Sequence, residues 1–351
     1  MGNKTGISWT DSTWNPIRGC SRVSEGCRHC YAEGMAARFS KPGQAYEGLA
    51  VMQNHKPHWT GQIAFVEKHL MDPMRWGQIL DDCRMCGAGP NDTCMHGSKA
   101  SPGSSRWRPR RIFVNSMSDL FHENVTDEMR DKIFTVMALS PQHRFQVLTK
   151  RPKRMLEYLN GDWCGRLIPW LHQWQERPEG WGVMLETVNG VLPNVWLGVT
   201  VENQQAADER IPLLLQTPAA VRFLSCEPLL GEVNLEELPS HSGIGRHLDA
   251  LSTFRDKHAD IKYGIDWVIV GGESGPGARP MQQAWARSLR DQCESSRVPY
   301  FFKQWGEWVP TTDPKIAEAR GIPLEQCMSH VGKHNAGSLL DGVDHKAFPA
   351  N

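Results

Sequence analysis

The residues best able to do chemistry are three cysteines near the N-terminus, Cys20, Cys27 and Cys30, in a C-x6-C-x2-C pattern. Three thiolates from one short loop can bind three irons of a four-iron, four-sulfur cluster and leave the fourth iron open. The amino and carboxylate groups of S-adenosylmethionine could chelate that open iron, and reductive cleavage of the molecule would give a carbon radical. A structural zinc site, with His29 or another histidine as fourth ligand, is the alternative that the pattern leaves open.

A second group of potential metal ligands consists of Cys83, Cys86, Cys94 and His96. A C-x2-C pair followed by a further Cys and a His supplies four ligands and predicts a structural zinc site, with an auxiliary iron–sulfur cluster as the alternative. The surrounding stretch 77–105 is polar and contains several Gly, Pro and Ser residues, which is typical of an insertion. We therefore expect a Cys-rich metal-binding insertion there.

Short apolar runs rich in β-branched and aromatic residues alternate with stretches of helical periodicity along the chain. The expected strands are 14–18, 111–115, 145–149, 195–201, 221–225, 267–270 and 299–303. The expected helices are 31–39, 127–139, 203–215 and 282–295. Alternating strands and helices predict an α/β fold with a parallel sheet. We expect a partial (β/α) barrel over residues 1–308 with a C-terminal extension over 309–351; a doubly wound sheet is the alternative.

Polar side chains follow the expected strands at their carboxyl ends, where barrels of this kind place their active sites. Carboxylates there could accept a hydrogen bond from the amino group of S-adenosylmethionine, basic groups could pair with its carboxylate, and Thr or Asn could bind its ribose. The candidate catalytic residues are Lys150, Arg151 and Glu227. The candidate cofactor-binding residues are Ser116, Ser118, Asp119, Thr200, Glu202, Asn203 and Glu273.

Composition narrows the class of protein. The 351 residues carry a formal net charge of zero, so no global field attracts the chain to nucleic acid or membrane. No apolar run approaches the roughly 18 residues of a membrane span, and the N-terminus lacks the apolar core of a signal peptide. We expect a cytoplasmic protein with no membrane partner.

Several segments together resemble a phage and prophage family of radical S-adenosylmethionine-like proteins of unassigned function. The segments are the cysteine loop (Gly-Cys, then Cys-Arg-His-Cys-Tyr-Ala), 7–16 (Ile-Ser-Trp-Thr-Asp-Ser-Thr-Trp-Asn-Pro), 110–122, 148–152 (Leu-Thr-Lys-Arg-Pro), 196–203, 223–228, 266–275 and 301–306. The chain departs from the family in its insertion at 77–105 and at Ser338, where the family tends to have Arg. The spacing of Cys20 and Cys27 is longer than in most radical enzymes.

The resemblance implies a radical-type partial barrel, a four-iron cluster and S-adenosylmethionine, in a phage-encoded protein of the host cytoplasm. The expected activity is hydrogen abstraction from a substrate by a 5′-deoxyadenosyl radical, with a flavodoxin or ferredoxin as electron donor. The expected substrate is a modified or hypermodified nucleobase or nucleotide of phage DNA, and one specific outcome is an isomerase- or aminomutase-like rearrangement. Two alternatives stay open: a radical enzyme acting on a small molecule or peptide, and a non-catalytic zinc-containing module that binds nucleic acid.

Overall fold

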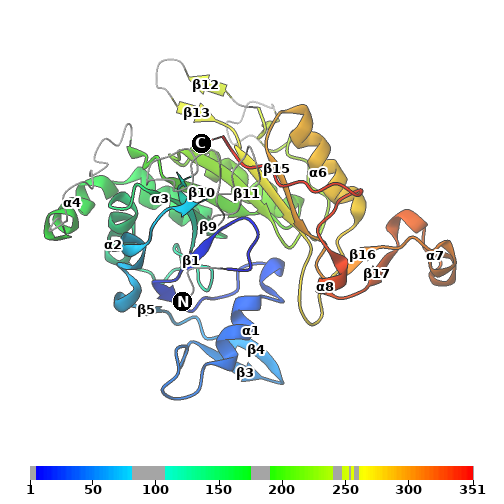
Figure 1. Cartoon of the computed structure of the whole chain (residues 1–351), viewed down its shortest axis with the longest axis horizontal. Coiled ribbons are helices and arrows are strands. Elements are labelled where there is room, and N and C mark those ends of the chain that lie inside the picture. The colour runs from blue at the N-terminus through cyan, green and yellow to red at the C-terminus, as the bar shows by residue number, and fades with distance from the viewer. Residues whose placement is uncertain are drawn as a thin grey trace, which may run out of the picture.

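The structure is a computed structural model, and it describes residues 5–80, 107–174, 190–239, 247–252, 254–256 and 261–350. Its centre is one sheet of parallel strands with helices packed against it (Figure 1). The strands, in sheet order, are β1 (Ser12–Trp14), β8 (Arg110–Val114), β9 (His143–Thr149), β10 (Val195–Thr200), β11 (Val221–Cys226), β14 (Trp267–Gly271) and β15 (Tyr300–Gln304). The second group of potential ligands, at Cys83, Cys86, Cys94 and His96, lies outside the described residues.

Strand order decides between the two architectures expected from the sequence. The strands follow one another across the sheet in the order of the chain, without a reversal. A doubly wound sheet requires such a reversal, so that alternative is excluded. The sheet is curled in Figure 1, and its end strands β1 and β15 do not pair within the described part of the chain, which makes it an open half-barrel.

The helices are connections between strands or additions to them. The larger helices share one buried core with the sheet, and α4 lies mainly against α2 and α3; they are α2 (Asp127–Ala138), α3 (Pro152–Asn160), α4 (Trp163–Trp174), α5 (Gln204–Gln216) and α6 (Gln283–Ser295). The Thr126 hydroxyl caps α2 by accepting from the Met129 amide, and the Asn203 side chain caps α5 by accepting from the Ala206 amide. These side-chain caps explain why the helices begin where the sequence pattern predicts them.

The expected first strand, 14–18, is displaced in the structure. β1 ends at Trp14, and Ile17 and Arg18 form β2 (Ile17–Arg18), which pairs with β5 (Ala64–Phe65) in a separate sheet. Pro16 lies between the two segments and has no amide hydrogen to continue a ladder. The predicted strand 14–18 is therefore wrong, because it joins the end of β1 to the separate strand β2.

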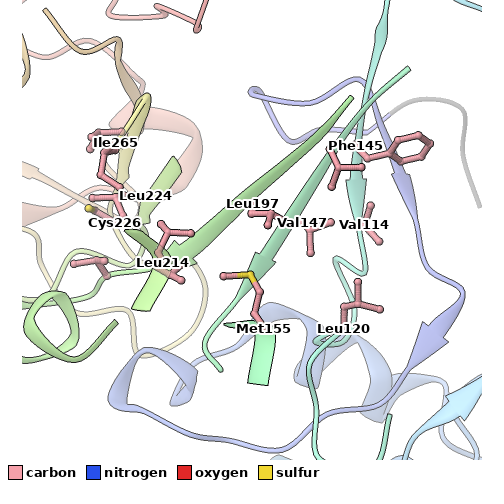
Figure 2. Packing of buried hydrophobic residues seen from close by; sticks show 14 of the residues in the cluster. Val114, Leu120, Phe145, Val147, Met155, Leu197, Leu214, Leu224, Cys226 and Ile265 are labelled. Carbon is pink, nitrogen blue, oxygen red and sulfur yellow. The ribbon is translucent and has the colours of Figure 1, made fainter. Parts of the chain in front are cut away.

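The two faces of the half-barrel carry different cores because side chains alternate along each strand. On the helix-covered face, Val147 and Leu197 of the sheet pack with Met155 of α3 and Leu214 of α5 (Figure 2). The inner face carries a second cluster that is mostly aromatic. Its buried members are Trp9, Phe113, Trp196, Phe223, Trp267, Ile269 and Phe301.

The C-terminal residues return to the barrel. Phe302 donates its amide hydrogen to the carbonyl of His345, and the Ala347 amide donates to Tyr300, so the tail runs beside the open edge of β15. The indole of Trp267 donates to the Ala347 carbonyl at 2.9 Å. The Phe348 ring then packs against the inner aromatic cluster, so the tail covers both an edge strand and an apolar surface.

Smaller elements surround the half-barrel. They are α1 (Tyr31–Arg38), the hairpin β3 (Ala50–Gln53) and β4 (Lys56–Trp59), the pair β6 (Ile79–Leu80) and β7 (Trp107–Arg108), the hairpin β12 (Phe254–Asp256) and β13 (Ile261–Tyr263), the pair β16 (Trp308–Pro310) and β17 (Met328–His330), α7 (Pro314–Arg320) and α8 (Lys333–Ala336). In Figure 1, α7 extends away from the sheet. Among the described residues, no helix combines the length and the apolar character needed to cross a bilayer.

Candidate functional site

A cavity of about 270 Å³ opens at the carboxyl ends of the strands. Its volume is close to the lower end of the range for small-molecule sites, about 300–1,000 Å³. The cysteine loop, residues 20–31, forms one part of the lining. The polar lining residues that follow strands are Asn115, Ser116, Ser118, Asp119, Lys150, Arg151, Glu227, Glu273, Ser274 and Gln304. The strand ends and the cysteine loop thus share one cavity.

All three cysteines of the loop line this cavity, and all three are free thiols. Burial is the main cause that raises the pKa of Cys20 to about 12, and Asp119 and Cys30 add to it. Burial also raises the pKa of Cys30. Buried thiols of this kind stay protonated at neutral pH unless a metal ion stabilises the thiolate. Among the described residues, no three His, Cys, Asp or Glu side chains are arranged to hold a metal ion.

The first support of the loop comes from the end of β9. The Nη2 atom of Arg151 donates to Ser21, at 2.7 Å to the hydroxyl and at 3.3 Å to the carbonyl. The same guanidinium donates to Asp119 at 3.1 Å and to Glu123 at 2.8 Å. Asp119 also accepts from the Thr149 hydroxyl and from the Lys150 amide. Arg151 and Asp119 are therefore occupied in joining the strand ends to the loop.

The second support comes from Glu202, which follows β10 and is 1% exposed. Its Oε1 accepts from the Ser24 hydroxyl at 2.6 Å, and its Oε2 accepts from Arg210 at 2.8 Å. A Cβ atom on Gly26 would overlap the Glu202 carboxylate, so only glycine allows the loop to approach this closely. Lys150 extends its ammonium to within 3.8 Å of the same carboxylate.

The third support comes from Glu273, which follows β14. Arg279 donates three hydrogen bonds to this carboxylate, at 2.6 Å from Nη2 and at 2.9 Å from Nε and from the backbone amide. The Nη2 atom also donates to the carbonyl of Glu25 in the cysteine loop at 2.9 Å. Three separate strand ends therefore hold the loop at Ser21, Ser24 and Glu25.

The other predicted ligands occupy varied places. Asn203 uses its side chain to cap α5 and does not line the cavity. Ser116 and Ser118 line the cavity, but their hydroxyls donate to Asn15 and to the Ile17 carbonyl. Thr200 lines the cavity and is 1% exposed.

Asn115 carries a buried hydrogen-bond donor, its side-chain Nδ2 atom. Its backbone is left-handed, with φ of 59°, a conformation that Asn tolerates better than most residues. Its Oδ1 accepts from the Ile17 amide, whereas its Nδ2 is buried without a hydrogen-bond partner among the described residues. Asn115 is also one of the residues that line the cavity.

Glu227 and Lys303 form an ion pair on the opposite part of the lining. The Lys303 ammonium is 2.6 and 2.8 Å from the two carboxylate oxygens, and the Gln304 amide donates to the same carboxylate at 3.3 Å. The side chains are 20% and 15% exposed. Neither Glu227 nor Lys303 takes part in the contacts, described above, that hold the cysteine loop.

Sequence reasoning gave no role to Lys303, Gln304, Arg279 or Ser21. Lys303 is recognisable only as a charged residue ending an aromatic run, Tyr300-Phe-Phe. Arg279 lies in a loop with no periodic pattern, so no local signal identifies it. Ser21 and Arg151 are 130 residues apart in sequence, and such a pairing depends on tertiary structure alone.

The fold and the site define an open parallel half-barrel with a cysteine-lined cavity at the carboxyl ends of its strands. Residues 4–349 match the model of the family described as Protein of unknown function (DUF5131), so the chain belongs to that family. Comparison with curated proteins and with solved structures gave no match.

Proposed function

We propose that the protein is a radical S-adenosylmethionine enzyme of the radical-type partial barrel class, acting in the cytoplasm on a nucleobase or nucleotide. A four-iron cluster bound by Cys20, Cys27 and Cys30 would supply one electron to S-adenosylmethionine, which would separate into methionine and a 5′-deoxyadenosyl radical that takes a hydrogen atom from the substrate. The observation that carries the proposal is that three free thiols of one loop line the same cavity as the polar strand ends.

The three cysteines of the loop match the number of protein ligands of a four-iron cluster with one open iron. A structural zinc ion would need a fourth ligand, such as His29, which also lines the cavity. In a cluster, each thiolate binds a different iron, so the sulfur atoms surround a volume and need not converge. The three cysteines border one cavity, and this shared position supports the proposed cluster.

The proposal explains why three sets of hydrogen bonds hold the cysteine loop. Arg151, Glu202 and the Glu273–Arg279 pair fix Ser21, Ser24 and Glu25, and so fix the backbone between the cysteines. A site that must keep three ligands in a set geometry gains from such rigid surroundings. These residues are therefore positioning residues.

Other lining residues are available to bind the cosubstrate. Lys150 can pair with a carboxylate, Thr200 can bond a hydroxyl, and the unpartnered Nδ2 of Asn115 can donate to a carbonyl or carboxylate oxygen. Trp9, Phe113 and Leu148 supply apolar surface to the same lining, which helps to exclude water from a reactive species.

The test is anaerobic purification and reconstitution, followed by measurement of iron, sulfide and zinc and of 5′-deoxyadenosine release under dithionite. Wild-type protein should bind iron and sulfide and release 5′-deoxyadenosine. Cys20→Ala, Cys27→Ala and Cys30→Ala should each lose the release, whereas Cys293→Ala, at a buried cysteine outside the cavity, should keep it. Zinc in place of iron, or release that survives all three loop substitutions, would refute the proposal.

A further inference from the structure

The Glu227–Lys303 pair is arranged so that both groups can meet a molecule in the cavity. Glu227 follows β11, and Lys303 belongs to β15; β14 lies between them in the sheet. Gly271 of β14 has no side chain at the crossing point, and a Cβ there would lie 3.4 Å from the Cγ and Cδ of Glu227. A Cβ there would be in ordinary van der Waals contact with both side chains, so the pair packs directly against Gly271 of β14.

Each member of the pair keeps unused hydrogen-bonding capacity among the described residues. A lysine ammonium has three donors, and two of them are accounted for by the two oxygens of Glu227. A carboxylate has about four acceptor positions, and Lys303 and Gln304 together use three of them. One donor of Lys303 and one acceptor of Glu227 therefore remain, on two side chains that both line the cavity.

The charge of the pair limits the chemistry of its ligand. A carboxylate and an ammonium together are neutral, so the pair offers no net attraction to a phosphate. A free amino acid could bind both groups only by pairing its ammonium with Glu227 and its carboxylate with Lys303. These contacts would compete with the existing ion pair. A neutral edge with a carbonyl oxygen next to an N–H leaves the ion pair intact and gains two charge-assisted hydrogen bonds.

The rest of the lining suits a flat ring. Trp9, Phe113 and Leu148 border the cavity, and sites for extruded or single nucleobases combine apolar surfaces with hydrogen bonds to one edge of the base. We propose that Glu227 and Lys303 bind the lactam edge of a nucleobase, Lys303 donating to the carbonyl oxygen and Glu227 accepting from the ring N–H. This assignment rests on the proposed function, which supplies the expectation of a nucleobase substrate.

The experiment measures binding of thymidine and of N3-methylthymidine to the full-length protein by calorimetry, without reductant, in the presence and absence of S-adenosylmethionine. The methyl group removes the ring N–H and should weaken binding by about 10-fold or more, as expected for a lost charge-assisted hydrogen bond. Glu227→Gln and Lys303→Met should weaken thymidine binding to a similar extent. Lys315→Met, which removes an exposed lysine of α7 outside the cavity lining, should leave it unchanged.

Equal binding of the two nucleosides, or no thymidine binding under either condition, would overturn the assignment. So would binding of L-methionine that depends on both Glu227 and Lys303, because that result would identify a zwitterion site. The readout is independent of radical chemistry. Nucleoside discrimination without 5′-deoxyadenosine release would refute the proposed function alone, and release without discrimination would refute the recognition pair alone.

Discussion

Arg151 contacts Ser21, the residue that follows Cys20, through one terminal nitrogen that donates to both the hydroxyl and the carbonyl. The other nitrogens of the same guanidinium bind Asp119 and Glu123. One planar side chain thus connects the end of β9 to the cysteine loop. A lysine could not make this set of contacts, because its ammonium lacks the fixed fork of donors.

Under the proposed function, the Arg151 contacts predict that Arg151→Lys weakens iron binding more than it weakens the fold. The charge opposite Asp119 is kept, while the bond to Ser21 is lost. Iron bound per chain after reconstitution should fall, and bound iron should be lost faster to a chelator. Fluorescence-monitored urea unfolding and iron analysis on the same sample would check both effects.

Arg151→Ala should be more damaging, since it leaves Asp119 buried without its cation, and breaking a buried pair costs about 3–5 kcal/mol. Arg38→Ala is a suitable control. Arg38 is exposed on α1, and its loss should change the free energy of unfolding by less than about 0.5 kcal/mol. Equal iron retention in Arg151→Lys and wild type would show that the arginine does not position the loop.

A second prediction concerns Gly26, where the loop approaches Glu202. In Gly26→Ala the new methyl would displace the Glu202 carboxylate and with it the bond to Ser24. We expect a loss of about 1–3 kcal/mol in the free energy of unfolding, as for other overpacked sites, together with reduced iron binding.

Gly34→Ala is the matched control for this substitution. Gly34 is inside α1, and a Cβ there would have no atom within 4 Å. An alanine in a helix interior is more stable than glycine by roughly 0.5–1 kcal/mol, so this variant should unfold at higher urea concentration. If both alanine variants behaved alike, the close approach of Glu202 to Gly26 would not matter for the loop.

Sequence patterns predicted the half-barrel because each strand is a short apolar run ending in polar residues. The strands at 110–114, 143–149, 195–200, 221–226, 267–271 and 300–304 confirm the six expected after the first. The expected first strand, 14–18, was wrong because the ladder with β8 ends at Trp14, and Pro16 then separates it from the pair that Ile17 and Arg18 form with β5. Local composition could not separate these two segments.

The sequence could not predict which partner each polar side chain at a strand end would bind. Asp119, Glu202 and Glu273 were expected to bind a cofactor, and Arg151 to be catalytic, because of their position after strands. In the structure, each of these side chains is bonded within the protein to the cysteine loop or to a group that holds it. A sequence locates a residue at the end of a strand, but the partner that occupies it is set by contacts between distant segments.

The C-terminal tail is the basis of a third prediction. Phe348 lies 5.1 Å from the ring centre of Trp267 and 5.2 Å from that of Phe301, and the Arg111 guanidinium lies 4.0 Å from the centre of its ring. Phe348→Ala should lower the free energy of unfolding by about 1–3 kcal/mol, less than the roughly 3–5 kcal/mol for a fully buried Phe. Tryptophan fluorescence should also change because of Trp267.

Leu339→Ala provides the comparison for Phe348, because Leu339 is also an apolar residue of the C-terminal segment but is 52% exposed. Its substitution should shift the free energy of unfolding by less than about 0.5 kcal/mol. A Phe348→Ala variant as stable as wild type would show that the tail contributes nothing to the inner aromatic cluster.

A fourth prediction follows from His143, which is fully buried at the start of β9, with its Nε2 3.0 Å from the Pro73 carbonyl. Burial is the main cause that lowers the pKa of His143 from 6.5 to about 4, with the Pro73 bond opposing it and Arg110 adding to it. The unfolded chain therefore binds a proton at a higher pH than the folded protein does. By linkage, stability is constant above about pH 6.5 and decreases as the pH falls toward 4.

The decrease attributable to His143 should total about 3 kcal/mol, from a pKa difference between 6.5 and about 4 at 1.36 kcal/mol per unit. His143→Gln has no proton to gain in this range and can still donate to Pro73. Urea unfolding at several pH values between 4 and 7 should give a steeper loss for wild type than for the variant. The carboxylates that titrate in this pH range contribute to both curves, so the difference between the curves gives the contribution of His143 to the free energy of unfolding. Parallel curves would mean that His143 is protonated equally in the folded and unfolded chains.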